Sequence, residues 1–226
     1  MLKILETHAD FYVIHKSSGL GMHCDGEELG VVTLLEQQTG ESLYPVHRLD
    51  KDTSGLLIIA RHKDAAREFG RLFEAHAIDK YYVTVGGNKP KKKQGLIQGD
   101  MVKSRNGNWM LTTSLKQPAS TQFFSYGTGL GYRLYLLRPL SGKTHQLRVA
   151  LKSLSAPIMG DLRYGGEPAE RLMLHAMVLR FTWREQLLTF MLLPSEEDGF
   201  VPCNWDQFPA FLQPWVQPWP HVKSKI

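Results

Sequence analysis

The chain has 226 residues, of which 42% are hydrophobic and 22% charged, and its formal net charge is +5 at pH 7. This composition supports a sizeable folded core and excludes an intrinsically disordered chain. No stretch reaches the ~18 apolar residues of a membrane span, and two cysteines are too few for a disulfide framework. We therefore expect a cytoplasmic protein that does not enter membranes, and its positive charge favours a polyanionic partner such as RNA.

The apolar pattern predicts many short strands and few helices. A first strand is expected at 11–15, a short helix at 31–38 and a longer helix at 63–76, where the apolar side chains recur at spacings of three and four. Further strands are expected at 80–85, 109–113, 121–126, 132–137, 174–181 and 187–192. Because strands and helices do not alternate regularly, the pattern indicates an α+β fold with a mixed, largely antiparallel central sheet and flanking helices.

We find no repeat or linker that would divide residues 1–203, so we expect a single domain there. The tail, 204–226, has an unusual composition, in which Trp and Phe alternate with four prolines. We expect it to pack on the domain, since aromatic side chains mainly bury apolar area. The alternative is a surface on which single-stranded RNA bases stack.

The most informative segment begins with His47-Arg48-Leu49-Asp50-Lys51 and continues through Asp52-Thr53-Ser54-Gly55 into five apolar residues. One carboxylate, Asp50, lies between the cations Arg48 and Lys51. Gly55 permits a sharp turn, and the apolar run predicts a buried strand. A polar loop attached to a rigid strand is a suitable place for a catalytic carboxylate.

This segment resembles the signature of the RluA-type pseudouridine synthases, which implies that Asp50 is the essential catalytic residue. The resemblance also implies that 1–203 is the catalytic domain. We expect it to be a stand-alone catalytic domain, because the first predicted strand, at 11–15, leaves no room ahead of it for the N-terminal RNA-binding domain that some members carry.

A second segment, Gly142-Lys143-Thr144-His145-Gln146-Leu147-Arg148, resembles the family's next large motif. Thr144 is expected to cap a helix that starts near His145 and buries its leucines, leaving Arg148 on the opposite side. The resemblance implies that Arg148 pairs with Asp50, and an Arg fork can hold a carboxylate in one orientation. Lys143 and Ala150 depart from the family pattern, in which Arg and His are usual.

Two further matches extend the resemblance over most of the domain. Tyr82, in Lys80-Tyr81-Tyr82, corresponds to the family's tyrosine that stacks on the target base, and strand alternation separates it from Tyr81. Pro157-Ile158-Met159-Gly160-Asp161, Tyr164-Gly165-Gly166 and Leu174-His175-Ala176 match segments that we interpret as structural. We expect Asp161 to bond the backbone.

The resemblance implies an RNA pseudouridine synthase that isomerises a specific uridine in ribosomal or transfer RNA after flipping the base out of its stack. Such a reaction needs no cofactor, and no zinc-type spacing of ligands occurs in the sequence. We expect a monomer that contacts RNA through Arg48, Lys51, Lys143, His145 and Lys152. The lysines around Pro90 are either phosphate contacts or a solvated turn.

Two other functions compete with this prediction. An RNA-binding module of the same fold would share the basic charge but would not need Asp50, Tyr82 and Arg148 together. A glycosidase-type enzyme would also place a carboxylate at an anomeric carbon, and it usually needs a second one. Asp52 and Asp161 are the nearby candidates for that second carboxylate.

Overall fold

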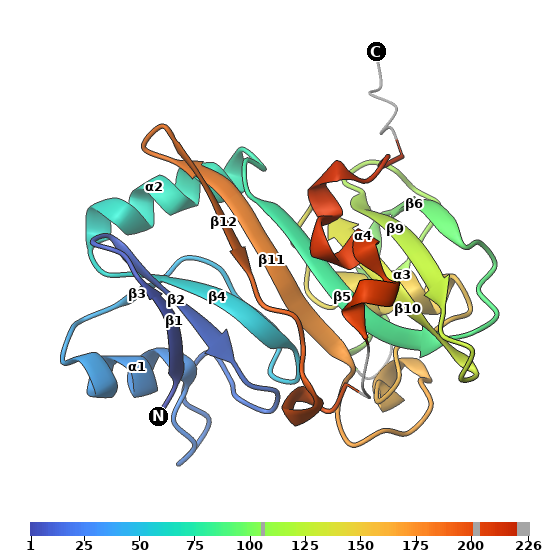
Figure 1. The fold of residues 1–226 in the computed structure, drawn as a ribbon, viewed down its shortest axis with the longest axis horizontal. Coiled ribbons are helices and arrows are strands. Elements are labelled where there is room, and N and C mark those ends of the chain that lie inside the picture. The colour runs from blue at the N-terminus through green and yellow to red at the C-terminus, as the bar shows by residue number, and fades with distance from the viewer. Residues whose placement is uncertain (105–106, 201–203, 221–226) are drawn as a thin grey trace. The chain divides into compact units, whose positions relative to one another are not determined.

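The computed structural model describes residues 1–104, 107–200 and 204–220, and their contacts divide them into two compact units (Figure 1). The first unit contains Met1–Lys80 and His175–Asp198. The second contains Tyr81–Leu174 and the described residues from Gly199 onward. The expected boundary at residue 203 and the end of the tail, 221–226, lie outside the described residues.

The first unit is built on a mixed sheet in the order β1-β2-β4-β11-β12, with the short β3 also paired to β4. The pair β4–β11 is parallel and the other pairs are antiparallel. Helices α1 and α2 complete this unit. The bounds are β1 Lys3–Thr7, β2 Phe11–Lys16, α1 Val31–Thr39, β3 Tyr44–Pro45, β4 Ser54–Ala60, α2 Lys63–Glu74, β11 Leu174–Trp183 and β12 Gln186–Met191.

The core of the first unit joins this sheet to α2. All seven residues of β4 are buried, and Phe69 of α2 stacks on Trp183 of β11 with ring centroids 4.3 Å apart. Phe11 meets both rings edge to face. Each fully buried ring of this kind contributes roughly 1.5–3 kcal/mol by leaving water. The strand that follows the Asp50 loop, β4, is therefore fixed in the hydrophobic core of this unit.

The second unit has an antiparallel sheet in the order β5-β10-β9-β6, together with the separate hairpin β7–β8 and the helix α3. The bounds are β5 Asp79–Gly87, β6 Gln94–Gly99, β7 Met101–Lys103, β8 Trp109–Leu111, β9 Ala119–Gly127, β10 Tyr132–Pro139, α3 Gln146–Ser153 and α4 Pro209–Leu212. Short 3-10 helices occur at Leu162–Tyr164, Glu196–Asp198, Trp205–Gln207 and Pro214–Val216.

The described part of the aromatic tail makes packing contacts within the second unit. Phe211 is fully buried, and the Trp219 ring lies 4.9 Å from that of Phe124 and 5.8 Å from that of Tyr81. Gln122 of β9 donates its side-chain amide to the carbonyl of Pro220. The stacking of RNA bases on this tail stays a prediction.

The α+β class with a mixed sheet and few helices is confirmed, and the predicted helices and strands are present with their ends moved by a few residues. Four strands were not predicted, namely β1, β3, β6 and β7. The prediction that Thr144 caps α3 is wrong, because His145 is the residue before the helix and no side chain caps it. Among the described residues, no helix is long and apolar enough to cross a membrane.

Candidate catalytic site

The Asp50 loop is a tight turn that enters β4. The amide of Thr53 donates to the Asp50 carbonyl at 3.0 Å, and Gly55 has a φ of +117°. A Cβ on Gly55 would lie 2.3 Å from the carbonyl oxygen of Ala176 on β11. Glycine is therefore required twice, for its backbone angle and for the close approach of the parallel strand.

Hydrogen bonds to three consecutive carbonyls fix the backbone of this loop. The Asp50 carbonyl accepts from Thr53, the Lys51 carbonyl accepts from Lys16 Nζ at 2.8 Å, and the Asp52 carbonyl accepts from Ser18 Oγ at 2.8 Å. Lys16 is fully buried, and its ammonium also donates to the carbonyls of Ser17 and Leu20. A buried ammonium is costly unless its donors are satisfied, so these bonds join the glycine-rich loop after β2 to the Asp50 loop.

His47 supports the loop and is electrically neutral. Its Nε2 accepts a hydrogen bond from the Ile58 amide at 2.9 Å, and its ring stacks on Phe73 with centroids 5.0 Å apart. Burial, with a smaller contribution from the charge of Lys80, lowers the pKa of the imidazole to about 3. Because Nε2 accepts, the proton of the neutral ring is assigned to Nδ1. His47 is thus a structural neighbour of Asp50 at neutral pH.

The two cations beside Asp50, Arg48 and Lys51, are both exposed. Lys51 Nζ forms an ion pair with a carboxylate oxygen of Glu28, which is also exposed, at 2.8 Å. Exposed ion pairs of this kind contribute about 0–1 kcal/mol to stability. Lys51 could therefore exchange Glu28 for a phosphate group at little cost in free energy.

Arg148 forms a two-point ion pair in the second unit. Its Nε donates to Asp161 Oδ2 at 2.8 Å and its Nη2 donates to Asp161 Oδ1 at 2.7 Å. Arg148 is 8% exposed and Asp161 is 1% exposed. The expectation that Asp161 bonds the backbone is wrong, since its carboxylate instead orients the guanidinium. The buried leucine face of α3 is confirmed, but Arg148 is buried with it.

Tyr164 gathers three of the predicted site residues around one ring. The guanidinium carbon of Arg148 lies 5.1 Å from the ring centroid, and Lys152 Nζ lies 5.6 Å from it. The Tyr164 hydroxyl lies 2.9 Å from His145 Nδ1 and accepts from the Trp109 amide at 3.1 Å. From the sequence, Tyr164 was interpreted only as part of a structural segment, because its pairing with α3 has no local signal in the sequence.

Tyr82 and Lys143 also belong to the second unit. Tyr82 lies on β5 opposite Leu137 and is half-buried, whereas its neighbours Tyr81 and Val83 are buried on the other side of the strand. The predicted alternation is therefore confirmed. Lys143 Nζ donates to the Gln117 carbonyl. The four lysines at 89, 91, 92 and 93 are all exposed.

The structure thus places the predicted residues in two groups. Asp50, Arg48 and Lys51 are on the loop of the first unit. The second unit brings Arg148, His145 and Lys152 together around Tyr164 and carries Tyr82 and Lys143 elsewhere on its strands and turns. The pairing of Arg148 with Asp50 stays a prediction.

Comparison with known proteins agrees with the motifs. The RNA pseudouridylate synthase family matches residues 10–153. An uncharacterized RNA pseudouridine synthase from Haemophilus influenzae is 44% identical over 93% of this chain and 96% of its own. A tRNA pseudouridine synthase C from Haemophilus ducreyi is 31% identical over 80% and 85%. The solved structure of human RNA Pseudouridylate Synthase Domain Containing 4 is 25% identical, with a TM-score of 0.73 over 87% of this chain and 90% of that one.

These matches and the mixed sheet define the chain as an isomerase of the pseudouridine synthase class. The chain belongs to the RNA pseudouridylate synthase family and is an RNA pseudouridine synthase of the RluA type.

Proposed function

We propose that this enzyme isomerises one specific uridine of a structured ribosomal or transfer RNA, and that Asp50 is its catalytic residue. The observation that carries the proposal is the dense signature around Asp50, on a loop whose backbone is bonded at three successive carbonyls. A rigid loop keeps a carboxylate in place relative to the reacting carbon, which lowers the entropic part of the barrier.

The reaction exchanges one bond to the ribose for another. The bond between uracil N1 and C1′ breaks, the uracil rotates, and a bond between C5 and C1′ forms, while C5 loses a proton and N1 gains one. A carboxylate near C1′ can attack that carbon, or it can stabilise or deprotonate an oxocarbenium-like sugar. Asp50 can take either role, and both routes are open. Neither consumes a second substrate, so we expect no cofactor.

Arg148 and Tyr82 are proposed to complete the site. Arg148 would orient Asp50 and balance its charge, as the family resemblance implies. Its bonds to Asp161 through Nε and Nη2 set the plane of the guanidinium. Tyr82 would stack on the uracil and relay a proton. Arg48 would occupy the position that the flipped base leaves, since flipping costs a few kcal/mol of stacking and pairing.

RNA is expected to be held through its backbone. Lys51, Lys143, His145 and Lys152 would contact phosphates, which position the RNA without reading its sequence. The relative from Haemophilus ducreyi is named for tRNA, which makes tRNA the first substrate to test. We also propose that the enzyme is monomeric and acts in the cytoplasm, where such RNA is found.

The competing functions have less support. A glycosidase-type mechanism needs a second carboxylate at the reacting carbon, but Asp161 is buried and occupied by Arg148. An inactive binding module has no use for a fixed Asp50 loop. Turnover of free nucleosides would favour the glycosidase, and turnover of folded RNA alone favours the isomerase.

The deciding experiment is tritium release from RNA labelled at uridine C5 and taken from cells that lack this protein. Wild type is compared with Asp50→Asn, which keeps the shape of the side chain and removes its charge. We expect release by wild type only, with RNA binding unchanged in the variant. Release by Asp50→Asn above a few per cent of wild type would refute the catalytic role of Asp50. No release by either protein, with RNA still bound, would favour the binding module.

A further inference from the structure

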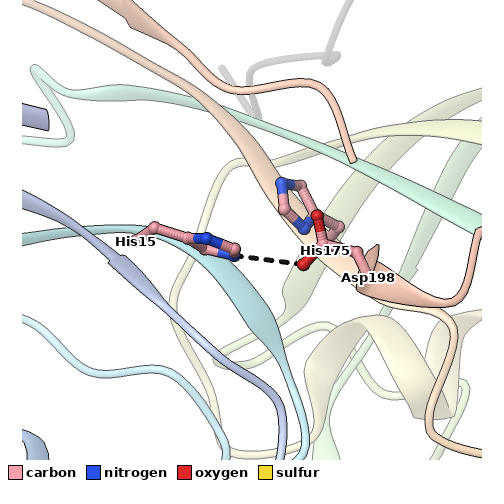
Figure 2. A group of neighbouring side chains, drawn as sticks. All are labelled: His15, His175 and Asp198. Atoms are coloured by element: carbon pink, nitrogen blue, oxygen red, sulfur yellow. Dashed lines mark ion pairs between the residues drawn. The ribbon is translucent and has the colours of Figure 1, made fainter. Parts of the chain in front are cut away.

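Three residues that the proposed reaction does not use come together in the first unit (Figure 2). His15 lies on β2, His175 lies near the start of β11, and Asp198 ends the 3-10 helix that follows β12. One donor atom from each residue lies within 4.8 Å of the other two. All three side chains are largely buried, His15 being 16% exposed and Asp198 9%.

The far sides of two of these side chains are held by neighbouring groups. His175 Nε2 lies 3.0 Å from the Leu192 carbonyl, which can only accept, so we assign the proton to Nε2 and a lone pair to Nδ1. Asp198 Oδ2 accepts from the amide and the hydroxyl of Ser195 at 3.1 and 3.3 Å. Metal-binding histidines and carboxylates are oriented in this way by partners behind them.

The contact between His15 and Asp198 has the spacing of two ligands of one ion. His15 Nε2 lies 3.2 Å from Asp198 Oδ1 (dashed in Figure 2). His15 Nε2 is buried, and Asp198 is its ion-pair partner rather than a well-aligned hydrogen-bond acceptor. Bonds of about 2.0–2.2 Å at tetrahedral angles place two ligand atoms about 3.3–3.6 Å apart, slightly farther than the 3.2 Å between these two atoms. The two atoms are therefore neighbours that are suited to share a third atom.

We propose that His15, His175 and Asp198 bind a divalent transition-metal ion of the Zn²⁺ type. Two imidazoles and one carboxylate suit zinc or another late transition metal, whereas Mg²⁺ and Ca²⁺ prefer all-oxygen sites. The Ser54 hydroxyl lies 2.7 Å from His175 Nδ1. Binding at Nδ1 requires this hydroxyl to turn away, and it then becomes, with water, a candidate for the fourth position.

Such an ion would be structural. It would join β2, β11 and the segment after β12, and through Ser54 it would reach the first residue of β4, which directly follows the Asp50 loop. An ion that binds only the folded protein stabilises it in proportion to the logarithm of its concentration over Kd. This proposal does not depend on the reaction assigned to Asp50.

The full chain is first stripped of metal with a chelator and then titrated with Zn²⁺ in a calorimeter. The titration is repeated with Co²⁺, whose visible d–d absorption is recorded. The variants are His15→Gln and Asp198→Asn. The control is the double variant His23→Gln/Cys24→Ser, which removes an exposed pair of potential ligands in the same unit. Circular dichroism without metal establishes that each variant is folded.

We expect one equivalent of Zn²⁺ to bind to wild type and to the control, with the Co²⁺ spectrum of a tetrahedral nitrogen–oxygen site. Losing a ligand should weaken binding by more than about tenfold, since losing an outer-shell partner already costs 10–100-fold. If Asp198→Asn fails to fold, His15→Gln decides. No binding to wild type, unchanged binding in His15→Gln, or loss of binding in the control would each overturn the proposal.

Discussion

The guanidinium of Arg148 is held by both carboxylate oxygens of Asp161, with bonds of 2.8 and 2.7 Å in a nearly dry environment. Tyr164, three residues after Asp161, lies 5.1 Å below the same guanidinium. The proposed partner of Asp50 is therefore oriented by two residues of one short segment. Asp161 is a positioning residue, because its carboxylate is enclosed by Arg148.

Asp161→Asn should destabilise the protein strongly. Removing the charge takes away one partner of a buried two-point ion pair, and breaking such a pair typically costs about 3–5 kcal/mol. The free energy of unfolding is measured by urea titration. Asp64→Asn is the matched control, since Asp64 forms an exposed pair with Arg67 and should cost less than about 1 kcal/mol. Equal losses of unfolding free energy in the two variants would show that the buried pair contributes no more to stability than the exposed pair.

Gly55→Ala should be more harmful than its size suggests. The new Cβ would clash with the backbone of Ala176 at a positive φ, so we expect a loss of more than about 2 kcal/mol. The control is Gly70→Ala in α2, where an added Cβ would have no atom within 4 Å. This substitution should stabilise the protein by up to about 1 kcal/mol, because alanine favours the helix over glycine. Thermal denaturation measures both changes, and a stable Gly55→Ala variant would contradict the close approach of β4 and β11.

Acid should destabilise the protein through His47. In the folded state its pKa is about 3, below the ordinary 6.5, so the unfolded chain binds the extra proton. Stability from this group is complete above pH 6.5 and is lost as the pH falls toward 3. At pH 5 the loss reaches about 2 kcal/mol, from 1.36 kcal/mol per pKa unit.

His47→Gln should remove this part of the pH dependence, because an amide oxygen can still accept from Ile58 and does not titrate. His23→Gln, at an exposed histidine, is the control and should leave the dependence as in wild type. The measurement is the urea midpoint at pH 7 and pH 5. Identical pH dependences for His47→Gln and wild type would rule out a neutral His47 in the folded protein.

Lys152→Gln should weaken RNA binding in a salt-dependent way. Lys152 is exposed on α3, and a phosphate contact there would release about one counterion. The slope of log K against log salt should then become shallower by roughly 0.7–0.9. Lys63→Gln on α2 removes the same charge from an exposed position with no proposed contact, and its slope should match wild type. A slope for Lys152→Gln that also matches wild type would remove Lys152 from the RNA surface.

Local patterns in the sequence determined the fold class and the elements that frame the Asp50 loop. The apolar run after Gly55 predicts β4, and the helical spacing around Phe69 predicts α2, because both signals lie within one element. β6 contains two glycines and only two large apolar residues, so it becomes a strand through its pairing with β9 and was missed. α3 begins one residue later than the capping pattern indicates, since His145 adopts a left-handed backbone and bonds Tyr164.

The family and the identity of Asp50 as the catalytic candidate follow from contiguous residues, so both could be predicted before any contact was known. The meetings of side chains across long separations could not, because they depend on how the chain folds. The parallel register of β4 and β11 places Ser54 beside His175, and the turn at Asp161 places that carboxylate against Arg148. Such contacts depend on strand pairing and on the path of loops, which leave no periodic signal within any one segment.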